Sequence, residues 1–301
     1  MSVISTEQLE LLLKTRTASD INDDFISKIS CLAKRFAAED LQKPIILLCG
    51  PSGSGKTTTA KLLEHFLDSS GHEAHTVSLD NYFKTVGEMT SPRTENGEID
   101  LESPECVDMS LLRSHLRSLA DCVPVDVPVF DFPTQSRSES TVRLARKSGE
   151  ILIFEGIHAL NPEVLQGGSY AQRLFVGVNT SVTCGTAVLT PEKIRLLRRL
   201  LRDRTHRAQS FEQTIARFSE VSRGERLFVN PTRKNADFEL DTFCPFELSV
   251  YRDLLLPDLK AFSLSYLREN GLCDAITVLE SLSPVNAENV PETSIINEFL
   301  Y

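Results

Sequence analysis

Residues 50–57 read Gly50-Pro51-Ser52-Gly53-Ser54-Gly55-Lys56-Thr57, which is a complete G-x-x-x-x-G-K-[ST] phosphate-binding loop. Its glycines allow consecutive backbone N–H groups to point at a phosphate chain. The Lys56 ammonium can reach the β- and γ-phosphates, and the Thr57 hydroxyl can bind Mg²⁺. We therefore expect a nucleotide to be bound by Gly50, Ser52, Gly53, Ser54, Gly55, Lys56, Thr57 and Thr58.

The flanks of this loop have the pattern that a phosphate loop needs. The apolar run Ile45–Cys49 predicts a buried strand, and the apolar spacing over residues 56–67 predicts a helix. A strand, a glycine-rich turn and a helix place a helix N-terminus against an anion. The loop alone does not distinguish a kinase from a GTPase, an ATPase or a transporter.

Composition narrows the class of protein further. The chain has 301 residues and a formal charge of −10, which favours one large α/β domain and argues against a nucleic-acid partner. No run approaches the roughly 18 apolar residues of a membrane span, and the N-terminus lacks a basic leader. Seven cysteines without a C-x-x-C pair indicate reduced thiols and no Cys/His metal site. We expect a cytoplasmic protein without a membrane partner.

Strand and helix patterns alternate along the chain, which predicts an α/β fold of the P-loop NTPase type, with a parallel sheet and helices on both faces. Residues 1–42 are predicted to be helical. Pro128 interrupts a strand over 125–132, so this strand is expected at an edge. Further strands are expected over 75–79, 151–154, 174–178 and 237–240, and helices over 109–119, 191–205 and 211–218.

Two acids follow predicted strands. Asp80 ends the second strand, where ligands of open α/β sheets bind, and its carboxylate can accept a proton from an acceptor hydroxyl. The alternative is a cap of the following turn. Glu155 follows the strand over 151–154 and can hold Mg²⁺ together with Thr57. A GTPase would show Asp-x-x-Gly and Asn-Lys-x-Asp, and neither occurs, while His158 is interpreted as structural.

A stripe of arginines follows one face of the helix over 191–205. Arg195, Arg198, Arg199 and Arg202 are spaced i, i+3, i+4 and i+7, and Arg207 extends the stripe. Because a guanidinium binds two phosphate oxygens at once, the stripe predicts a mobile helical lid that closes over ATP. The alternative is a solvated basic helix.

Taken in order, these stretches resemble the uridine kinase / phosphoribulokinase family of P-loop kinases. The segments that carry the resemblance are GPSGSGKTT, SLDNYFK, VPVFDFPTQSR, ILIFEGIHAL and RLLRRLLRD. The similarity is greatest to a longer bacterial uridine-kinase-like branch, in which RGERLFVNP and the terminal SIINEFL also have counterparts. It runs from about Pro44 to the C-terminus.

This resemblance implies an ATP- and Mg²⁺-dependent kinase that phosphorylates the 5′-hydroxyl of a nucleoside. It implies a helical extension over 1–42 and a kinase domain over 43–301, with the lid at about 191–218. The implied catalytic residues are Lys56, Asp80, Arg199 and Arg202. Arg207 is implied to bind ATP, Thr57 and Glu155 to bind the metal, and Glu102, Phe130, Gln135 and Arg137 to bind the acceptor.

Three departures leave the acceptor open. Uridine–cytidine kinases have His where this chain has Gln135 and Tyr where it has Phe130, and their lid has Gly-Arg where it has Ala208-Gln209. Uridine or cytidine is the first expectation, and another nucleoside or a sugar-like alcohol is the second. A non-catalytic nucleotide-binding regulator is the third. Homo-oligomerisation and the role of residues 1–42 stay open.

Overall fold

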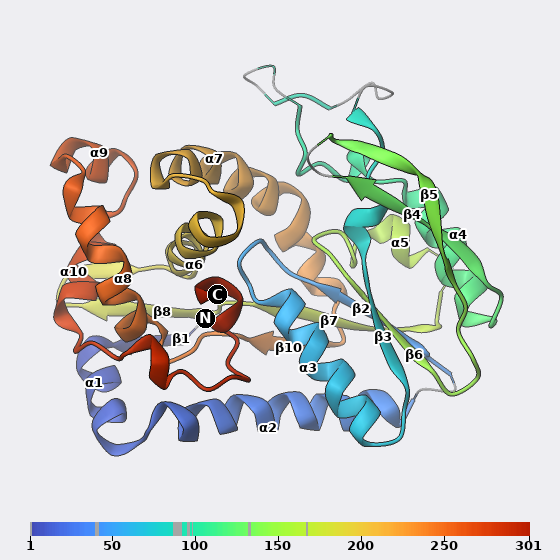
Figure 1. The fold of residues 1–301 in the computed structure, drawn as a ribbon, viewed down its shortest axis with the longest axis horizontal. Coiled ribbons are helices and arrows are strands. Elements are labelled where there is room, and N and C mark those ends of the chain that lie inside the picture. The colour runs from blue at the N-terminus through green and yellow to red at the C-terminus, as the bar shows by residue number, and fades with distance from the viewer. Residues whose placement is uncertain are drawn as a thin grey trace.

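A five-stranded parallel sheet lies at the centre of the molecule (Figure 1). The structure, a computed structural model, describes residues 2–39, 42–86, 92–94, 97, 99–131, 134–166 and 168–301. The sheet has the order β10-β7-β2-β6-β3, and every pairing in it is parallel. Its strands are β2 (Ile45–Cys49), β3 (Ala74–Ser78), β6 (Ile151–Glu155), β7 (Ala171–Gly177) and β10 (Phe238–Asp241). The predicted α/β fold is confirmed.

Helices cover both faces of this sheet, because the side chains of a strand alternate between its faces. On one face Ile46 and Leu48 pack against α2 (Ala18–Ala37) and α3 (Lys56–Ser69). On the other face Leu47 packs in a core that includes α4 (Met109–Ala120) and α5 (Pro162–Leu165). Strand β2 is buried along its whole length, which explains why its sequence is continuously apolar.

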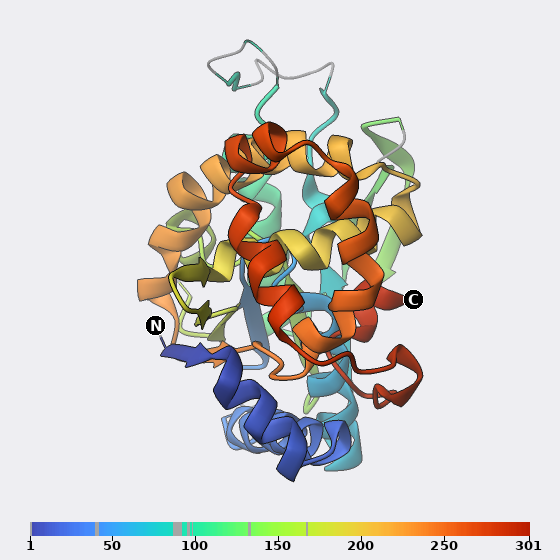
Figure 2. The ribbon, with the colours of Figure 1, turned by 90° about the vertical axis from the view of Figure 1, so that its left-hand side faces the viewer.

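A third apolar core lies beside the sheet, in the half of the molecule turned toward the viewer in Figure 2. It is built around helix α6 (Pro191–Arg207) and a three-stranded sheet of order β1-β8-β9. The elements of this half are β1 (Ser2–Ser5), α1 (Thr6–Thr15), β8 (Thr180–Cys184), β9 (Ala187–Leu189), α7 (Phe211–Gly224), α8 (Glu247–Ala261), α9 (Leu264–Glu269), α10 (Cys273–Ser281) and α11 (Asn297–Leu300). Helix α7 continues into the π-helix Glu225–Val229, whose Val229 packs in the core with α4.

The N-terminal segment differs from the helical prediction at its start. Residues 2–5 form strand β1, which pairs in parallel with β8. The partner strand lies far along the chain, so a four-residue run without hydrophobic periodicity does not reveal the pairing. Leu9 and Phe36 are fully buried in two different cores, so this segment is packed against the rest of the chain. Its status as a separate domain stays a prediction.

An antiparallel ribbon stands at the end of the sheet where β3 leads into a short 3₁₀ helix, Leu79–Tyr82. It consists of β4 (Val125–Asp131) and β5 (Ser136–Leu144). Its register shifts between Pro128 and Phe130, as expected at a residue without an N–H group. The predicted strand is confirmed up to Asp131, and its last residue lies outside the described ranges. Among the described residues, no helix has the length and apolarity needed to cross a bilayer.

Candidate active site

The phosphate loop connects β2 to α3 and its conformation depends on glycine. A Cβ atom on Gly50 would lie 2.0 Å from the carbonyl oxygen of Val176, so the chain passes too close to β7 for a side chain. Gly55 has φ +81° and caps the start of α3, a conformation that favours glycine. The Lys56 ammonium donates to the carbonyl of Pro51 at 3.1 Å. Together these features form a loop that ends on a helix N-terminus, which attracts anions.

The register of the parallel sheet brings the two predicted acids to this loop. Glu155 lies opposite Leu48 of β2 and opposite Ser78 of β3, so all three strands end at one edge. Burial raises the pKa of Asp80, while Lys56 lowers it. Burial also raises the pKa of Glu155 to about 7, and the nearby Asp80 adds to the shift. Asp80, Glu155 and Lys56 therefore form one electrostatic cluster.

The acids and hydroxyls of this cluster suit a magnesium ion. Thr57, Ser78 and Glu155 line one open groove of about 580 Å³ beside α3. Their oxygens are the hard ligands that Mg²⁺ prefers. The two partly buried carboxylates, Asp80 and Glu155, have raised pKa values, and a divalent ion beside them would favour their charged forms. Thr57 and Glu155 would hold the ion, which would neutralise phosphate charge when bound.

The first arginines of the stripe are buried, which corrects the alternative of a solvated basic helix for the first turns of α6, while the lid role of residues 191–218 stays a prediction. Arg195, Arg198 and Arg199 are 6%, 0% and 6% exposed, and the leucines on the opposite face are buried as well. The spacing of arginine and leucine along the helix is compatible with a buried arginine face and with a solvent-exposed one. The sequence alone therefore did not decide between them. Only the far end of the helix, residues 204–207, is exposed.

Arg195 is neutralised by an acid and binds the phosphate loop from outside. It forms a two-pronged ion pair with Glu225, with both N–O distances 2.7 Å, and donates to the carbonyl of Ser52 at 2.8 Å. The Ser52 amide donates to the same Glu225 carboxylate at 2.8 Å. This amide, which was expected to face phosphate, is therefore engaged with a protein acid. Arg195 acts here as a support for the loop.

Arg198 has the same kind of role at the next residues of the loop. Its guanidinium pairs with Glu247 at 2.7 Å and donates to the carbonyls of Gly53 at 3.2 Å and Thr242 at 2.7 Å. The Thr242 hydroxyl donates to the carbonyl of Ser54 at 2.8 Å. The Ser54 amide in turn donates to the carbonyl of Pro51 at 3.2 Å, so these bonds fix the conformation of this part of the loop.

The other three arginines share a single acid. Arg199, Arg202 and Arg207 lie 3.6, 2.7 and 3.4 Å from carboxylate oxygens of the buried Asp203. Burial, with help from the neighbouring Arg202 charge, lowers the pKa of Arg199 to about 10. Three guanidinium groups beside one carboxylate leave an excess of positive charge, which phosphate oxygens can neutralise. These three are also the arginines that the family resemblance implied as lid cations, Arg199 and Arg202 as catalytic residues and Arg207 as an ATP-binding residue.

Glu102, which was predicted to bind the acceptor, lies in the same electrostatic environment as Lys56 and Arg199. Burial raises its pKa to about 7, with the nearby charge of Glu225 adding to the shift and Arg199 opposing it. Its side chain packs on Gly224, where an added Cβ would lie 2.2 Å from the Cβ of Glu102. The structure thus places Glu102 against the end of α7, and its contact with an acceptor stays a prediction.

The three remaining acceptor candidates lie on the ribbon. The ring of Phe130 is 5.6 Å from that of Phe83. Arg137 donates to the carbonyls of Phe83 at 2.8 Å and Tyr82 at 3.0 Å, so it fixes the turn that follows Asp80. Gln135 occupies the turn between β4 and β5 with φ +51°. Their contact with an acceptor stays a prediction.

Sequence reasoning missed the acids that neutralise the arginines, Glu225, Glu247 and Asp203. One signal was available for Glu247, which stands alone between the apolar residues Phe246 and Leu248. A single acid in an apolar stretch indicates a buried partner. It does not reveal which of the arginines is the partner.

His158 is buried, as its structural interpretation predicts, and it makes stability depend on pH. Burial lowers its pKa to about 4 from an ordinary value of 6.5, so the unfolded chain takes up the proton first and stability falls as pH drops between these values. We expect wild-type protein to lose about 2 kcal/mol more unfolding free energy than a His158→Met variant on going from pH 7 to pH 5. Urea unfolding at both pH values measures this, and equal pH dependence of the two proteins would contradict it.

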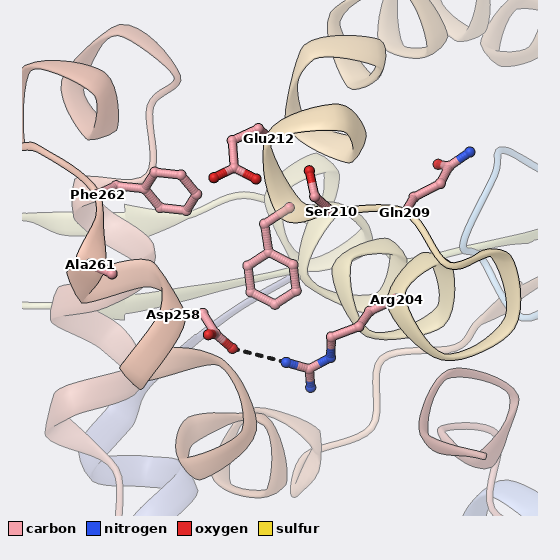
Figure 3. Close-up of a pocket in the computed structure, with 8 residues that line it drawn as sticks. Arg204, Gln209, Ser210, Glu212, Asp258, Ala261 and Phe262 are labelled. Atoms are coloured by element: carbon pink, nitrogen blue, oxygen red, sulfur yellow. Dashed lines mark hydrogen bonds and ion pairs between the residues drawn. The ribbon is translucent and has the colours of Figure 1, made fainter.

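A second pocket, of about 330 Å³, lies where the α6–α7 turn meets α8 (Figure 3). Arg204 in its wall pairs with Asp258 at 2.9 Å and lies over the ring of Phe211. Gln209 stands at its rim, and the preceding Ala208 has φ +50°. The pocket therefore adjoins the part of the lid at which the chain departs from uridine–cytidine kinases.

The parallel sheet and its phosphate loop define a P-loop fold, and the family match makes the protein a phosphotransferase with a hydroxyl acceptor. Residues 45–245 match the Phosphoribulokinase / Uridine kinase family, and the chain belongs to this family. The family resemblance inferred from the sequence is confirmed.

Two relatives illustrate the degree of similarity. A uridine kinase of Anoxybacillus flavithermus is 32% identical over 199 residues, which cover 65% of this chain and 85% of that protein. A uridine kinase of Staphylococcus carnosus is 32% identical over 194 residues, covering 64% and 84%. A solved structure from Silicibacter sp. TM1040, described as a candidate fructose transport system kinase, superposes with a TM-score of 0.51 at 18% identity, covering 70% of this chain and 98% of that one. At this identity the superposition supports the fold alone.

Proposed function

We propose that the protein transfers the γ-phosphoryl group of ATP to the 5′-hydroxyl of a nucleoside, with uridine or cytidine as the first candidates and Mg²⁺ as the metal. The observation that carries the proposal is the convergence of Asp80 and Glu155 on the phosphate loop at one edge of the sheet. The similarity to proteins named uridine kinase supports the choice of acceptor. We further propose a cytoplasmic location.

Each proposed step has a residue in this chain. Asp80 accepts the proton of the acceptor hydroxyl. The hydroxyl oxygen of the acceptor then forms a bond to the γ-phosphorus, while the bond between this phosphorus and the bridging oxygen breaks and ADP leaves. Lys56 and the three arginines around Asp203 balance the charge on the transferred group. Positioning and charge neutralisation carry most of the catalysis in such a site.

Two other functions have specific support. Gln135 and Phe130 replace the histidine and tyrosine of uridine–cytidine kinases, which favours another nucleoside or a sugar-like alcohol as the acceptor. Ala208 and Gln209 replace a glycine and an arginine of the lid, which favours a nucleotide-binding regulator without turnover. The complete set of Lys56, Asp80 and Glu155 argues against the regulator.

ADP release from ATP and Mg²⁺ against a panel of nucleosides and sugars tests the proposal. We expect uridine or cytidine to give rates at least about tenfold above every sugar, because a site with polar partners for a base rejects ligands that leave them unpaired. The Asp80→Asn variant serves as the blank. Release with sugars alone would move the assignment to the second function, and ATP binding without release for any acceptor would favour the regulator.

A further inference from the structure

The last residues of the chain return to the phosphate loop. In Figure 1 the C-terminus lies beside the start of α3. Ile295, Ile296 and Phe299 are at most 2% exposed, so this tail, residues 291–301, is firmly packed. Phe299 lies under the guanidinium of Arg198 at 5.2 Å, next to the ion pair that supports the loop.

The Glu298 carboxylate lies at the start of α3, where an anion is expected to bind. One oxygen of its carboxylate accepts from the Thr58 amide at 3.2 Å and from the Thr58 hydroxyl at 2.8 Å. The Thr58 amide is one of the groups expected to face nucleotide phosphate. Glu298 also lies close enough to Glu155 to add to the rise in its pKa. A protein carboxylate therefore occupies a place where a nucleotide phosphate is expected.

A second contact closes the loop from the same side. A Cβ on Gly55 would lie 2.5 Å from Cδ1 of Ile295, so the tail packs directly on the loop glycine. Helix α2 holds the tail in this position. Asn22 donates to the hydroxyl of Thr293 at 2.9 Å, and Ile21 and Asn22 line a small cavity together with Ile295.

We propose that the C-terminal tail is an autoinhibitory element, and that ATP binds in competition with Glu298. This inference rests on the proposed function, because it requires ATP as the ligand of the loop. One amide N–H cannot serve a carboxylate and a phosphate at once, and the two anions repel each other at the same helix N-terminus. Nucleotide binding therefore requires Glu298 to leave Thr58. Helix α2 then serves as the brace that keeps the tail closed.

Replacing Glu298 by Gln tests the competition, since it removes the charge with little change in shape. A tail that is closed nine-tenths of the time weakens ATP binding about tenfold, so we expect the Kd for ATP to fall by up to about tenfold in the variant. Calorimetric titration of the full-length proteins with ATP measures the Kd. Glu292→Gln is the matched control, because Glu292 is an exposed acid of the same tail. Its Kd should equal that of wild type.

Hydrogen exchange of wild-type protein provides a second measurement. Saturating ATP should increase amide exchange over residues 294–301, because the tail must leave the loop. An unchanged or weaker affinity of Glu298→Gln, or increased protection of the tail by ATP, would overturn the inference while leaving the kinase proposal standing. Absence of ATP binding to wild type and to both variants would instead contradict the proposed function.

Discussion

Replacing Asp80 by Asn is expected to lower kcat by about 10²–10⁴-fold, the range that one proton-transfer group contributes in enzymes. The carboxylate lies after the carboxyl end of β3, partly buried near the charges of Lys56 and Arg207, where an acceptor hydroxyl would meet the γ-phosphate. Asparagine preserves shape but cannot accept the proton. Because the phosphate contacts come from the loop, the Kd for ATP should stay within about twofold.

Steady-state ADP release measures the effect of the Asp80 substitution on kcat, and ATP titration of the same preparation measures its effect on the Kd for ATP. Asp121→Asn is a suitable control, since Asp121 is an exposed acid at the end of α4, away from the loop. A kcat close to wild type in Asp80→Asn would show that Asp80 only caps its turn. A large loss of ATP affinity would mean that the carboxylate shapes the loop.

Replacing Glu247 by Gln is expected to lower the free energy of unfolding by about 3–5 kcal/mol, because it leaves a buried guanidinium without its counter-charge. Arg198 and Glu247 are both fully buried and paired through two nitrogens, at 2.7 and 2.9 Å. Urea unfolding measures the loss. The matched control is Glu280→Gln, which breaks the exposed pair with Lys260 and should cost at most about 1 kcal/mol.

A double variant separates stability from loop support. Arg198→Met with Glu247→Leu removes both charges, so much of the stability should return. The carbonyls of Gly53 and Thr242 lose their donor in this variant, so its ATP affinity should be lower than that of wild type. If the single Glu247 variant lost no more stability than Glu280→Gln, the buried pair would contribute no more to the free energy of unfolding than the exposed pair does. If the double variant bound ATP as wild type does, Arg198 would not position the loop.

Local patterns were enough to predict the sheet and its ligand. The central strands β2 and β6 are short apolar runs, and parallel strands end at the same edge, so Asp80 and Glu155 could be placed beside Lys56 from sequence alone. Strand β1 could not be predicted, because its stability comes from pairing with β8 rather than from its own four residues. The same holds for the buried environment of α6.

The sequence by itself determined that this chain has a phosphate loop, two acids near it and a helix rich in arginine. Only the tertiary structure decided which arginines remain available for phosphate, since the acids that neutralise Arg195 and Arg198 lie 30 and 49 residues further along the chain. It also brought Glu298 to Thr58 across 240 residues. The physical reason is that hydrophobic periodicity reports which face of an element is buried, whereas the charge balance of a buried group depends on the segment that folding packs against it.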